Sequence, residues 1–251
     1  MDICGCMYVN RVNDDVFETF LKSFRSVSDA LLQVYIGEPD YDEVLKKICA
    51  EYNVMPITLA PEAYQGQRCY SKMLCAHNFL VGLPPNSRTI FCDVDLYFLA
   101  DPFTAFDRLG PTDDLGITTR ICSYKHMVNS GFWISKNTSA MQDVLGQQFG
   151  KYAIENQQYK DWFIDQLYLN HLWLRKEKYL VDIGYQYNFC PNTDVFGVEL
   201  AQDMIRRAYE CRAVKVLHLK SELKMLVYEG FLKYAVTKRP NGIWNWQRIQ
   251  K

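Results

Sequence analysis

The sequence predicts an α/β protein with a mostly parallel central sheet and helices on both faces. Strand-like apolar runs alternate with segments whose apolar residues recur at helical spacing through the first part of the chain. With 251 residues, of which 49% are apolar and 14% aromatic, the chain can bury a sizeable core. No repeat, low-complexity segment or linker divides the sequence, so we expect a single domain over residues 1–251.

The expected strands are short runs rich in apolar and β-branched residues. They cover Ile3 to Val9, Leu31 to Ile36, Val54 to Leu59 and Arg88 to Asp93. Because helices separate these strands, their carboxyl ends should meet at one edge of the sheet, where ligands of such folds bind.

Three helices are expected between these strands. Asp14 and Asp15 favour the positive N-terminal end of the first, and apolar residues then recur at helical spacing: Val16, Phe17, Phe20, Leu21 and Phe24. One face of the second is formed by Val44, Leu45, Ile48 and Cys49. The third covers residues 67–81 and ends at Gly82, ahead of Pro84 and Pro85.

Charge and cysteine usage limit the partners and the compartment. The 28 basic and 29 acidic residues give a net charge of −1, which argues against nucleic acid as a partner. No apolar run approaches the roughly 18 residues of a membrane span, and no charged leader with an apolar block is recognisable. The nine cysteines lie mostly in apolar runs, as in proteins of reducing compartments, so we expect a cytoplasmic location.

The segment richest in chemistry is the end of the fourth strand, where Asp93 and Asp95 follow an apolar run. Two carboxylates two positions apart can reach one hard divalent cation, and their repulsion is costly unless a metal or a proton neutralises it. The alternative is a solvated turn in which Asp95 caps a helix. The apolar run before the pair favours the metal site.

Two classes of enzyme carry D-x-D after a strand. Haloacid-dehalogenase-like phosphatases use the first Asp as nucleophile, near the N-terminus and with Thr or Val four residues on. Here the pair lies deep in the chain and Tyr97 holds that fourth position. Glycosyltransferases of the GT-A fold have D-x-D after several βα units, where it binds a metal on a nucleotide-sugar diphosphate, and this order is similar to that of the present chain.

Four further motifs make the resemblance specific. In chain order they are Asn129-Ser130-Gly131-Phe132-Trp133-Ile134, Asp165-Gln166-Leu167-Tyr168-Leu169-Asn170, Tyr187-Asn188-Phe189-Cys190-Pro191, and Val216-Leu217-His218 followed by Lys224. Together with D-x-D they resemble the motifs of the retaining GT-A enzymes of glycosyltransferase family 8, over residues 3–225. The chain departs from the family pattern at Leu167, at Ser221 and at Met225-Leu226.

A metal site follows from these residues. His218 ends an apolar strand, where its imidazole is a candidate third ligand beside Asp93 and Asp95; the alternative is a packed core histidine. Such ligands with diphosphate oxygens suit Mn²⁺ or Mg²⁺, and the nitrogen ligand favours Mn²⁺. The metal would stabilise the departing nucleoside diphosphate, and Lys224 would add positive charge toward the same phosphates.

The donor sugar is expected to contact two amides and one carboxylate. Asn129 and Gln166 suit sugar hydroxyls, and Asp165 can bind them too. The resemblance implies that Gln166 lies beneath the anomeric carbon, which accords with transfer with retention. An inverting reaction would instead use Asp165 as the base that deprotonates the acceptor.

The nucleotide is expected to contact the end of the first strand and the third helix. The resemblance implies nucleoside contacts at Tyr8 and Asn10, with strand-end packing as the alternative. Arg68 or Lys72 should reach the phosphates or the base, with surface solvation as the alternative. Val94, between the two aspartates, is included among the expected donor contacts.

The sequence thus predicts a metal-dependent hexosyltransferase. Residues 1–100 would bind the nucleotide and residues 101–225 the sugar and acceptor, while the tail 226–251 would cap the acceptor site, rest on a membrane surface or pack on the domain. The expected donor is UDP-glucose or UDP-galactose, and the acceptor a hydroxyl of a glycan, glycolipid or protein. The alternative from another class is a non-catalytic nucleotide-sugar or glycan-binding module on the same fold.

Overall fold

The computed structural model describes residues 1–9, 14–119, 128–224, 234–238 and 244–248. Its centre is a seven-stranded sheet in the order β3-β2-β1-β4-β7-β6-β8. The strands are β1 (Asp2–Tyr8), β2 (Leu31–Gly37), β3 (Val54–Leu59), β4 (Arg88–Cys92), β6 (Leu115–Thr119), β7 (Val128–Lys136) and β8 (Leu180–Asp182). Within this sheet only β7 runs against the others, because both β4 and β6 pair with it in antiparallel register.

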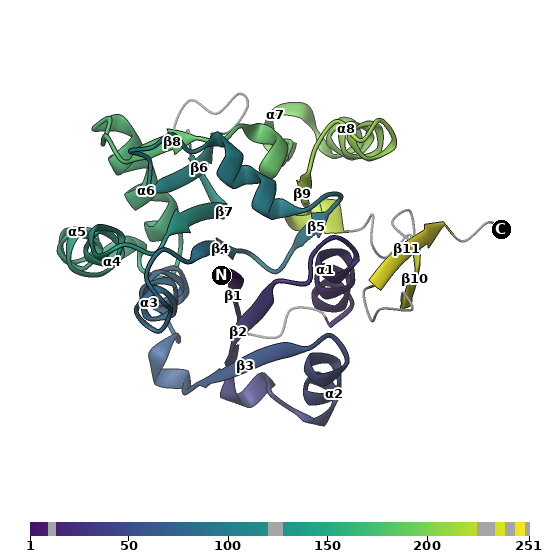
Figure 1. Ribbon diagram of the computed structural model, residues 1–251, viewed down its shortest axis with the longest axis horizontal. Helices are drawn as coiled ribbons and strands as arrows, with labels where there is room; N and C mark the ends of the chain where they lie inside the picture. The colour runs from purple at the N-terminus through teal and green to yellow at the C-terminus, as the bar shows by residue number, and fades with distance from the viewer. Residues whose placement is uncertain (10–13, 120–127, 225–233, 239–243, 249–251) are drawn as a thin grey trace.

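Helices cover both faces of this sheet, as predicted (Figure 1). One side carries α1 (Asp14–Val27) and α2 (Glu43–Glu51). The other carries α3 (Arg68–Val81), α4 (Ser139–Asp143), α5 (Phe149–Glu155) and α6 (Ile164–Leu174). The four predicted strands and three predicted helices of the first half are therefore confirmed, and the ends of the strands and of the third helix lie within about a residue of those expected.

Each face of the sheet has its own apolar core. Beneath α1 and α2, the fully buried Phe17, Phe20 and Phe24 pack with strand residues such as Val34 and Cys92. On the opposite face, α3 and α6 bury their apolar residues against the other side of the same strands. Strand residues therefore alternate between two cores, which explains why β1, β2 and β4 read as nearly continuous apolar runs.

A second, smaller sheet brings the late part of the chain to the main sheet. In it β5 (Leu96–Phe98) pairs antiparallel with β9 (Val216–His218). A third apolar cluster packs α8 (Val198–Glu210) beside it, and α7 (Thr193–Phe196) contacts α8. Since β5 begins directly after the D-x-D segment, this pairing decides which late residue lies beside the aspartates.

The tail forms a hairpin of β10 (Tyr234–Lys238) and β11 (Trp244–Arg248), with β11 beside α1 (Figure 1). The predicted roles of residues 226–251 at the acceptor or a membrane remain predictions. Among the described residues no helix combines the length and apolarity that a bilayer crossing requires. The described cysteines are free thiols, and most are buried, as the core usage predicted.

Candidate functional site

The site lies where β4 ends, in contact with the start of β7 and with β9. Asp93 follows β4, and its backbone N–H donates to the carbonyl of Gly131 on β7 at 2.8 Å. Asp95 precedes β5, and the β5–β9 register pairs Leu96 with His218. The carbonyl of Asp95 also accepts from the N–H of Leu219 at 2.9 Å. Backbone pairing thus brings His218 to the two aspartates across more than a hundred residues of chain.

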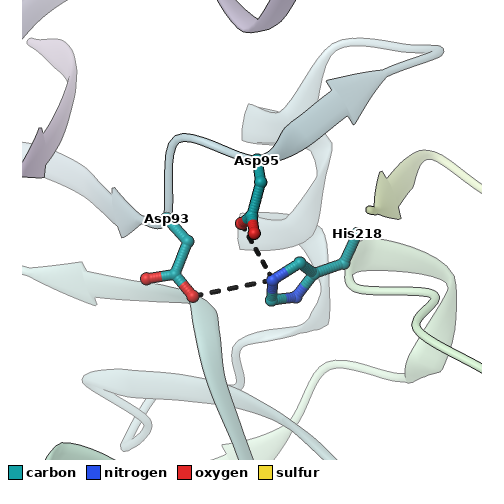
Figure 2. Close-up of side chains that lie close together, drawn as sticks. All are labelled: Asp93, Asp95 and His218. Carbon is teal, nitrogen blue, oxygen red and sulfur yellow. Dashed lines mark ion pairs between the residues drawn. The ribbon is translucent and has the colours of Figure 1, made fainter. Parts of the chain in front are cut away.

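Asp93, Asp95 and His218 form a group that could hold a metal ion, hereafter the carboxylate–imidazole cluster (Figure 2). His218 Nε2 lies 3.1 Å from Asp95 Oδ1 and 3.6 Å from Asp93 Oδ2. The three ligand atoms all lie within 4.8 Å of one another. Within the described part of the chain, this is the one such group of three or more metal-ligating side chains.

The state of His218 supports a cation at this position. The imidazole is fully buried, and burial lowers its pKa despite the nearby Asp95, so the ring is neutral at physiological pH. Its Nδ1 lies 2.8 Å from Asn188 Oδ1, while Nε2 faces carboxylate oxygens of Asp95 and Asp93 at 3.1 and 3.6 Å. A buried imidazole nitrogen that faces two carboxylates fits a metal ligand better than a packed core histidine.

Asp95 is also suited to a cation. Burial would raise the pKa of its carboxyl, but contact with His218 and the positive charges of Lys224 and Lys220 outweigh burial, and the pKa lies below its ordinary value. Lys224 Nζ lies 3.2 Å from Asp95 Oδ2. Asp95 Oδ1 is buried and faces His218 Nε2 at 3.1 Å. The carboxylate is therefore ionised, with one oxygen left over for a ligand.

Close packing of β7 makes a glycine necessary beside this cluster. A Cβ on Gly131 would lie 2.1 Å from His218 Cε1 and 2.9 Å from Asp93 Oδ2. Any side chain at this position would displace both ligands, since real Cβ contacts are never so short. Gly131, quoted above only as part of a motif, is thus a spatial requirement of the cluster.

Lys72 joins the cluster to the sugar side of the site. Its Nζ lies 2.6 Å from Asp93 Oδ1 and 3.0 Å from Asp165 Oδ2, and it donates to the carbonyl of Ser130 at 3.0 Å. Burial would lower the pKa of Lys72, but Asp93 and Asp165 outweigh it and raise the pKa above its ordinary value. Lys72, Asp93 and Asp165 are called the lysine cluster below. Lys72 therefore contacts two aspartates and also lines the cavity, and the contact of Arg68 or Lys72 with the nucleotide stays a prediction.

Asp165 and Gln166 occupy the first turn of α6 and are 3% and 2% exposed. Burial would raise the pKa of Asp165, but Lys72 and hydrogen bonds from Ser130 and the backbone of Gln166 lower it overall. Phe163, the residue that precedes the helix, has a φ of 77°, a strained conformation for a bulky side chain. This sharp entry into α6 directs both polar side chains inward.

A cavity of about 260 Å³ connects these groups. Its lining residues include Tyr8, Arg68, Lys72, Asp93, Val94, Asp95, Asp165, Gln166 and Lys224. Nine of the predicted site residues thus surround one space. His218 and Asn129 do not line it: His218 lies behind the two aspartates, and Asn129 is 1% exposed, with Oδ1 accepting from the N–H of Gly131 at 3.0 Å.

Tyr8, one of the predicted nucleotide contacts, already has partners in the protein. Tyr8 is 3% exposed, its ring stacks on Phe17 at 4.5 Å, and its hydroxyl donates to Asp14 at 3.2 Å. This favours the packing alternative for much of the Tyr8 ring, although the residue also borders the cavity. Asn10 lies outside the described residues.

Arg68 forms part of a rim at the cavity. Its Nε donates to Asp161 at 3.0 Å, and its guanidinium lies 5.9 Å from the ring centre of Trp162. Asp161 also accepts from the backbone N–H of Arg68 at 3.2 Å, so it caps the first turn of α3. Sequence reasoning missed Asp161, Trp162 and Phe163, because no spacing rule links a loop residue to a helix end 93 positions away.

Comparison with solved structures identifies the fold. The glycosyltransferase GlyE of Streptococcus pneumoniae TIGR4 superposes with a TM-score of 0.62 at 16% identity, over 93% of this chain and 61% of that one. The galactosyltransferase LgtC, in complex with donor and acceptor sugar analogs, gives 0.60 at 13% identity, over 88% and 87%. The chain has the fold of these glycosyltransferases.

A third solved structure extends this likeness to the full length of another enzyme. A glycosyltransferase that takes part in glycosylating the major capsid of PBCV-1 gives a TM-score of 0.55 at 8% identity, over 92% of this chain and all of the other. No family model and no curated protein matches the chain. The predicted GT-A fold is thus confirmed by structure alone, since the sequences have diverged so far.

Proposed function

We propose that the protein is a metal-dependent glycosyltransferase, which moves a hexose from a nucleotide diphosphate sugar to a hydroxyl acceptor. The observation that carries the proposal is the convergence of Asp93, Asp95 and His218 beside a cavity that Asp165 and Gln166 also border. The glycosyltransferase fold supports the same class of reaction. We propose UDP-glucose or UDP-galactose as donor, and a glycan, glycolipid or protein hydroxyl as acceptor, on the family resemblance alone.

The residues around the cavity have complementary tasks in this reaction. Mn²⁺ or Mg²⁺, when bound by Asp93, Asp95 and His218, supplies Lewis-acid stabilisation of the diphosphate leaving group. Lys224 and Lys220 line the same cavity and add positive charge on the side of Asp95. Lys72 holds Asp165 ionised and in one position, so that its carboxylate can orient sugar hydroxyls.

The environment of Asp165 supports retention over inversion. A general base works best when its pKa lies near the operating pH. Lys72 lowers the pKa of Asp165 and occupies one of its oxygens at 3.0 Å, which makes the carboxylate a weak base. The departing phosphate oxygen can instead accept the proton of the acceptor, with Gln166 beneath the anomeric carbon.

The test is a survey of nucleotide sugars with Mn²⁺ or with a chelator, in which release of the nucleotide and transfer to small glycoside acceptors are measured. We expect turnover only with metal, and tighter UDP binding with Mn²⁺ than with chelator in calorimetry. UDP binding with no turnover on any donor would favour the non-catalytic binding module. UDP affinity that is equal with and without metal would reject the metal site.

Two variants and the stereochemistry of the product distinguish retention from inversion with Asp165 as base. Gln166→Ala should lower turnover by roughly ten- to a hundredfold, the loss of one contact worth about 1.4 to 2.7 kcal/mol in the transition state. Asp165→Asn should retain measurable transfer. NMR of the product's anomeric proton distinguishes the two outcomes directly: an α product from an α-linked donor supports retention, and a β product supports Asp165 as base.

The predicted division at residue 100, the tail's role at an acceptor or membrane and the cytoplasmic location are kept as proposals. They rest on sequence order, on Trp244 and Trp246 in the tail and on the cysteine usage of the chain. The chain spans 61% of the GlyE chain it matches, so the activity of a whole protein of that length is likewise a proposal.

A further inference from the structure

Asn188 lies directly behind the carboxylate–imidazole cluster, on the side away from the two aspartates. It is 4% exposed, and its Oδ1 lies 2.8 Å from His218 Nδ1. Backbone hydrogen bonds also connect the two segments. The N–H of Phe189 donates to the carbonyl of Val216 at 3.0 Å, and the N–H of His218 donates to the carbonyl of Phe189 at 2.9 Å. Asn188 and His218 are therefore held in fixed register.

The orientation of the Asn188 amide follows from its other contacts. Its Nδ2 lies 2.9 Å from Thr118 Oγ1 and 3.4 Å from the carbonyl oxygen of Asn129. A backbone carbonyl can only accept, so the NH₂ group must be the end that faces Asn129. A flipped amide would oppose two oxygens there. Oδ1 consequently faces His218, and the hydrogen bond between them requires a proton on Nδ1.

We propose that Asn188 is a positioning residue that fixes His218 in the Nδ1–H tautomer, so that the lone pair of Nε2 faces Asp93 and Asp95. The part of this proposal that concerns metal binding rests on the proposed function. The chain of contacts is continuous: the Asn129 carbonyl orients the Asn188 amide, and the amide selects the tautomer.

The alternative tautomer would prevent His218 from binding a metal ion. With the proton on Nε2, the ring would donate to Asp95 Oδ1, which lies only 3.1 Å away. The nitrogen would then have no lone pair for a metal, and one carboxylate oxygen would be occupied. Loss of such an outer partner of a metal-ligating histidine weakens metal affinity by about 10- to 100-fold.

The experiment compares the wild type with Asn188→Leu and Asn188→Ala, which lack the acceptor, and with Asn188→Asp, which keeps it. The first readout is the ring ¹⁵N spectrum of the metal-free protein, in which the chain's four histidines give few signals to assign. The second is the affinity for Mn²⁺ alone, measured by electron paramagnetic resonance. Asn137→Leu is the matched control, since Asn137 is equally buried but donates to Leu83 and Pro84.

We expect the Nδ1–H tautomer in the wild type, in Asn188→Asp and in Asn137→Leu. Whichever of Asn188→Leu and Asn188→Ala folds should show the Nε2–H tautomer, with Mn²⁺ affinity lower by 10- to 100-fold. Asn188→Asp should bind Mn²⁺ better than either. A merely structural role predicts the reverse order, because Asp buries a charge.

The proposal is overturned if the wild-type ring carries its proton on Nε2, or if the variants without an acceptor keep Nδ1–H. The tautomer readout needs no metal, which separates this proposal from the proposed function. A wild type that binds no Mn²⁺ while its tautomer depends on residue 188 would reject the metal site and leave the positioning role of Asn188 supported.

Discussion

The two charged clusters of the site share Asp93 but differ in how their negative charge is neutralised. In the lysine cluster, one ammonium lies 2.6 and 3.0 Å from two carboxylates. In the carboxylate–imidazole cluster, two carboxylates face a neutral imidazole, and Lys224 contacts only one oxygen of Asp95. The first cluster is closed within the protein, and the second leaves ligand atoms open toward a cation.

This difference separates positioning from ligand binding. A buried carboxylate pair with its own cation is held rigidly, and removal of that cation exposes the full cost of two buried charges. A cluster in which two carboxylates and an imidazole nitrogen face one another offers a divalent ion a prepared site. Variants in the lysine cluster should therefore affect folding, and variants in the other cluster should affect catalysis.

The largest effect is expected for Asp95→Asn, which should lower turnover. The substitution keeps the shape but removes one charged ligand, so we expect Mn²⁺-dependent turnover to fall at least about a thousandfold, or about 4 kcal/mol. The thermal midpoint measured in chelator should fall slightly, because the folded protein lowers the pKa of Asp95 and so favours its charged form.

Asp114→Asn is a matched control for this variant. Asp114 is a partly buried carboxylate paired with Lys136 at 3.7 Å, at the far end of β7 from the cluster. Its turnover should remain near that of the wild type. If Asp95→Asn turned over at the wild-type rate, Asp95 would not be a metal ligand and the contrast between the clusters would fail.

The next largest effect is expected for Lys72→Met, which should lower the free energy of unfolding. Met has a similar length but no charge, so Asp93 and Asp165 would lose the ammonium between them. We expect the free energy of unfolding to fall by about 3 to 5 kcal/mol, as when one partner of a buried ion pair is removed. Urea denaturation measures this loss.

Lys136→Met serves as the comparison, because Lys136 is more exposed and should contribute no more than about 1 kcal/mol through its ion pair with Asp114. The double variant Lys72→Met with Asp165→Asn should recover part of the lost stability, since one buried charge is removed as well. Equal losses in the two lysine variants would show that the lysine cluster contributes no more than a surface pair.

The smallest expected effect is on the loss of folding stability at low pH. The pKa of Asp165 is lower in the folded protein than the ordinary value near 3.9, so the folded state binds fewer protons. Its contribution is therefore present above pH 4 and lost as the pH falls through the folded pKa, at no more than about 1.4 kcal/mol per pH unit.

Urea denaturation at several pH values between 7 and 3 measures how the free energy of unfolding falls with pH in the wild type and in Asp165→Asn. The variant should lose less stability than the wild type as the pH falls below 5. Asp95 also has a lowered pKa but is present in both proteins, so it cancels in the comparison. Parallel pH profiles would mean that Lys72 does not hold Asp165 ionised.

Local signals were sufficient for the strands and helices of the first half of the fold. The spacing of Phe17, Phe20 and Phe24 predicted α1, and the apolar run before Asp93 predicted β4, because periodicity depends only on near neighbours in sequence. Gly82 marked the end of α3 for the same reason. Order along the chain also identified the D-x-D segment, and it brought His218 into consideration.

Long-range contacts supplied what these signals lacked. Lys72 was considered only as a candidate nucleotide contact, and its contacts with Asp93 and Asp165, which come from other elements, were not predicted. Asn188 was part of a quoted motif without a role until its amide was seen to contact His218. Nothing near either residue in sequence indicates those partners, since each contact joins segments 21 or more positions apart.

The sequence by itself determined the α/β alternation, the carboxylates at the end of β4 and the residue types suited to a divalent cation. Only the tertiary structure decided which charges are neutralised within the protein and which remain open to a ligand. The physical reason is that charge compensation and tautomer depend on distances of about 3 Å between side chains from different elements. Those distances are set by strand register and packing, as the β5–β9 pairing does for Asp95 and His218.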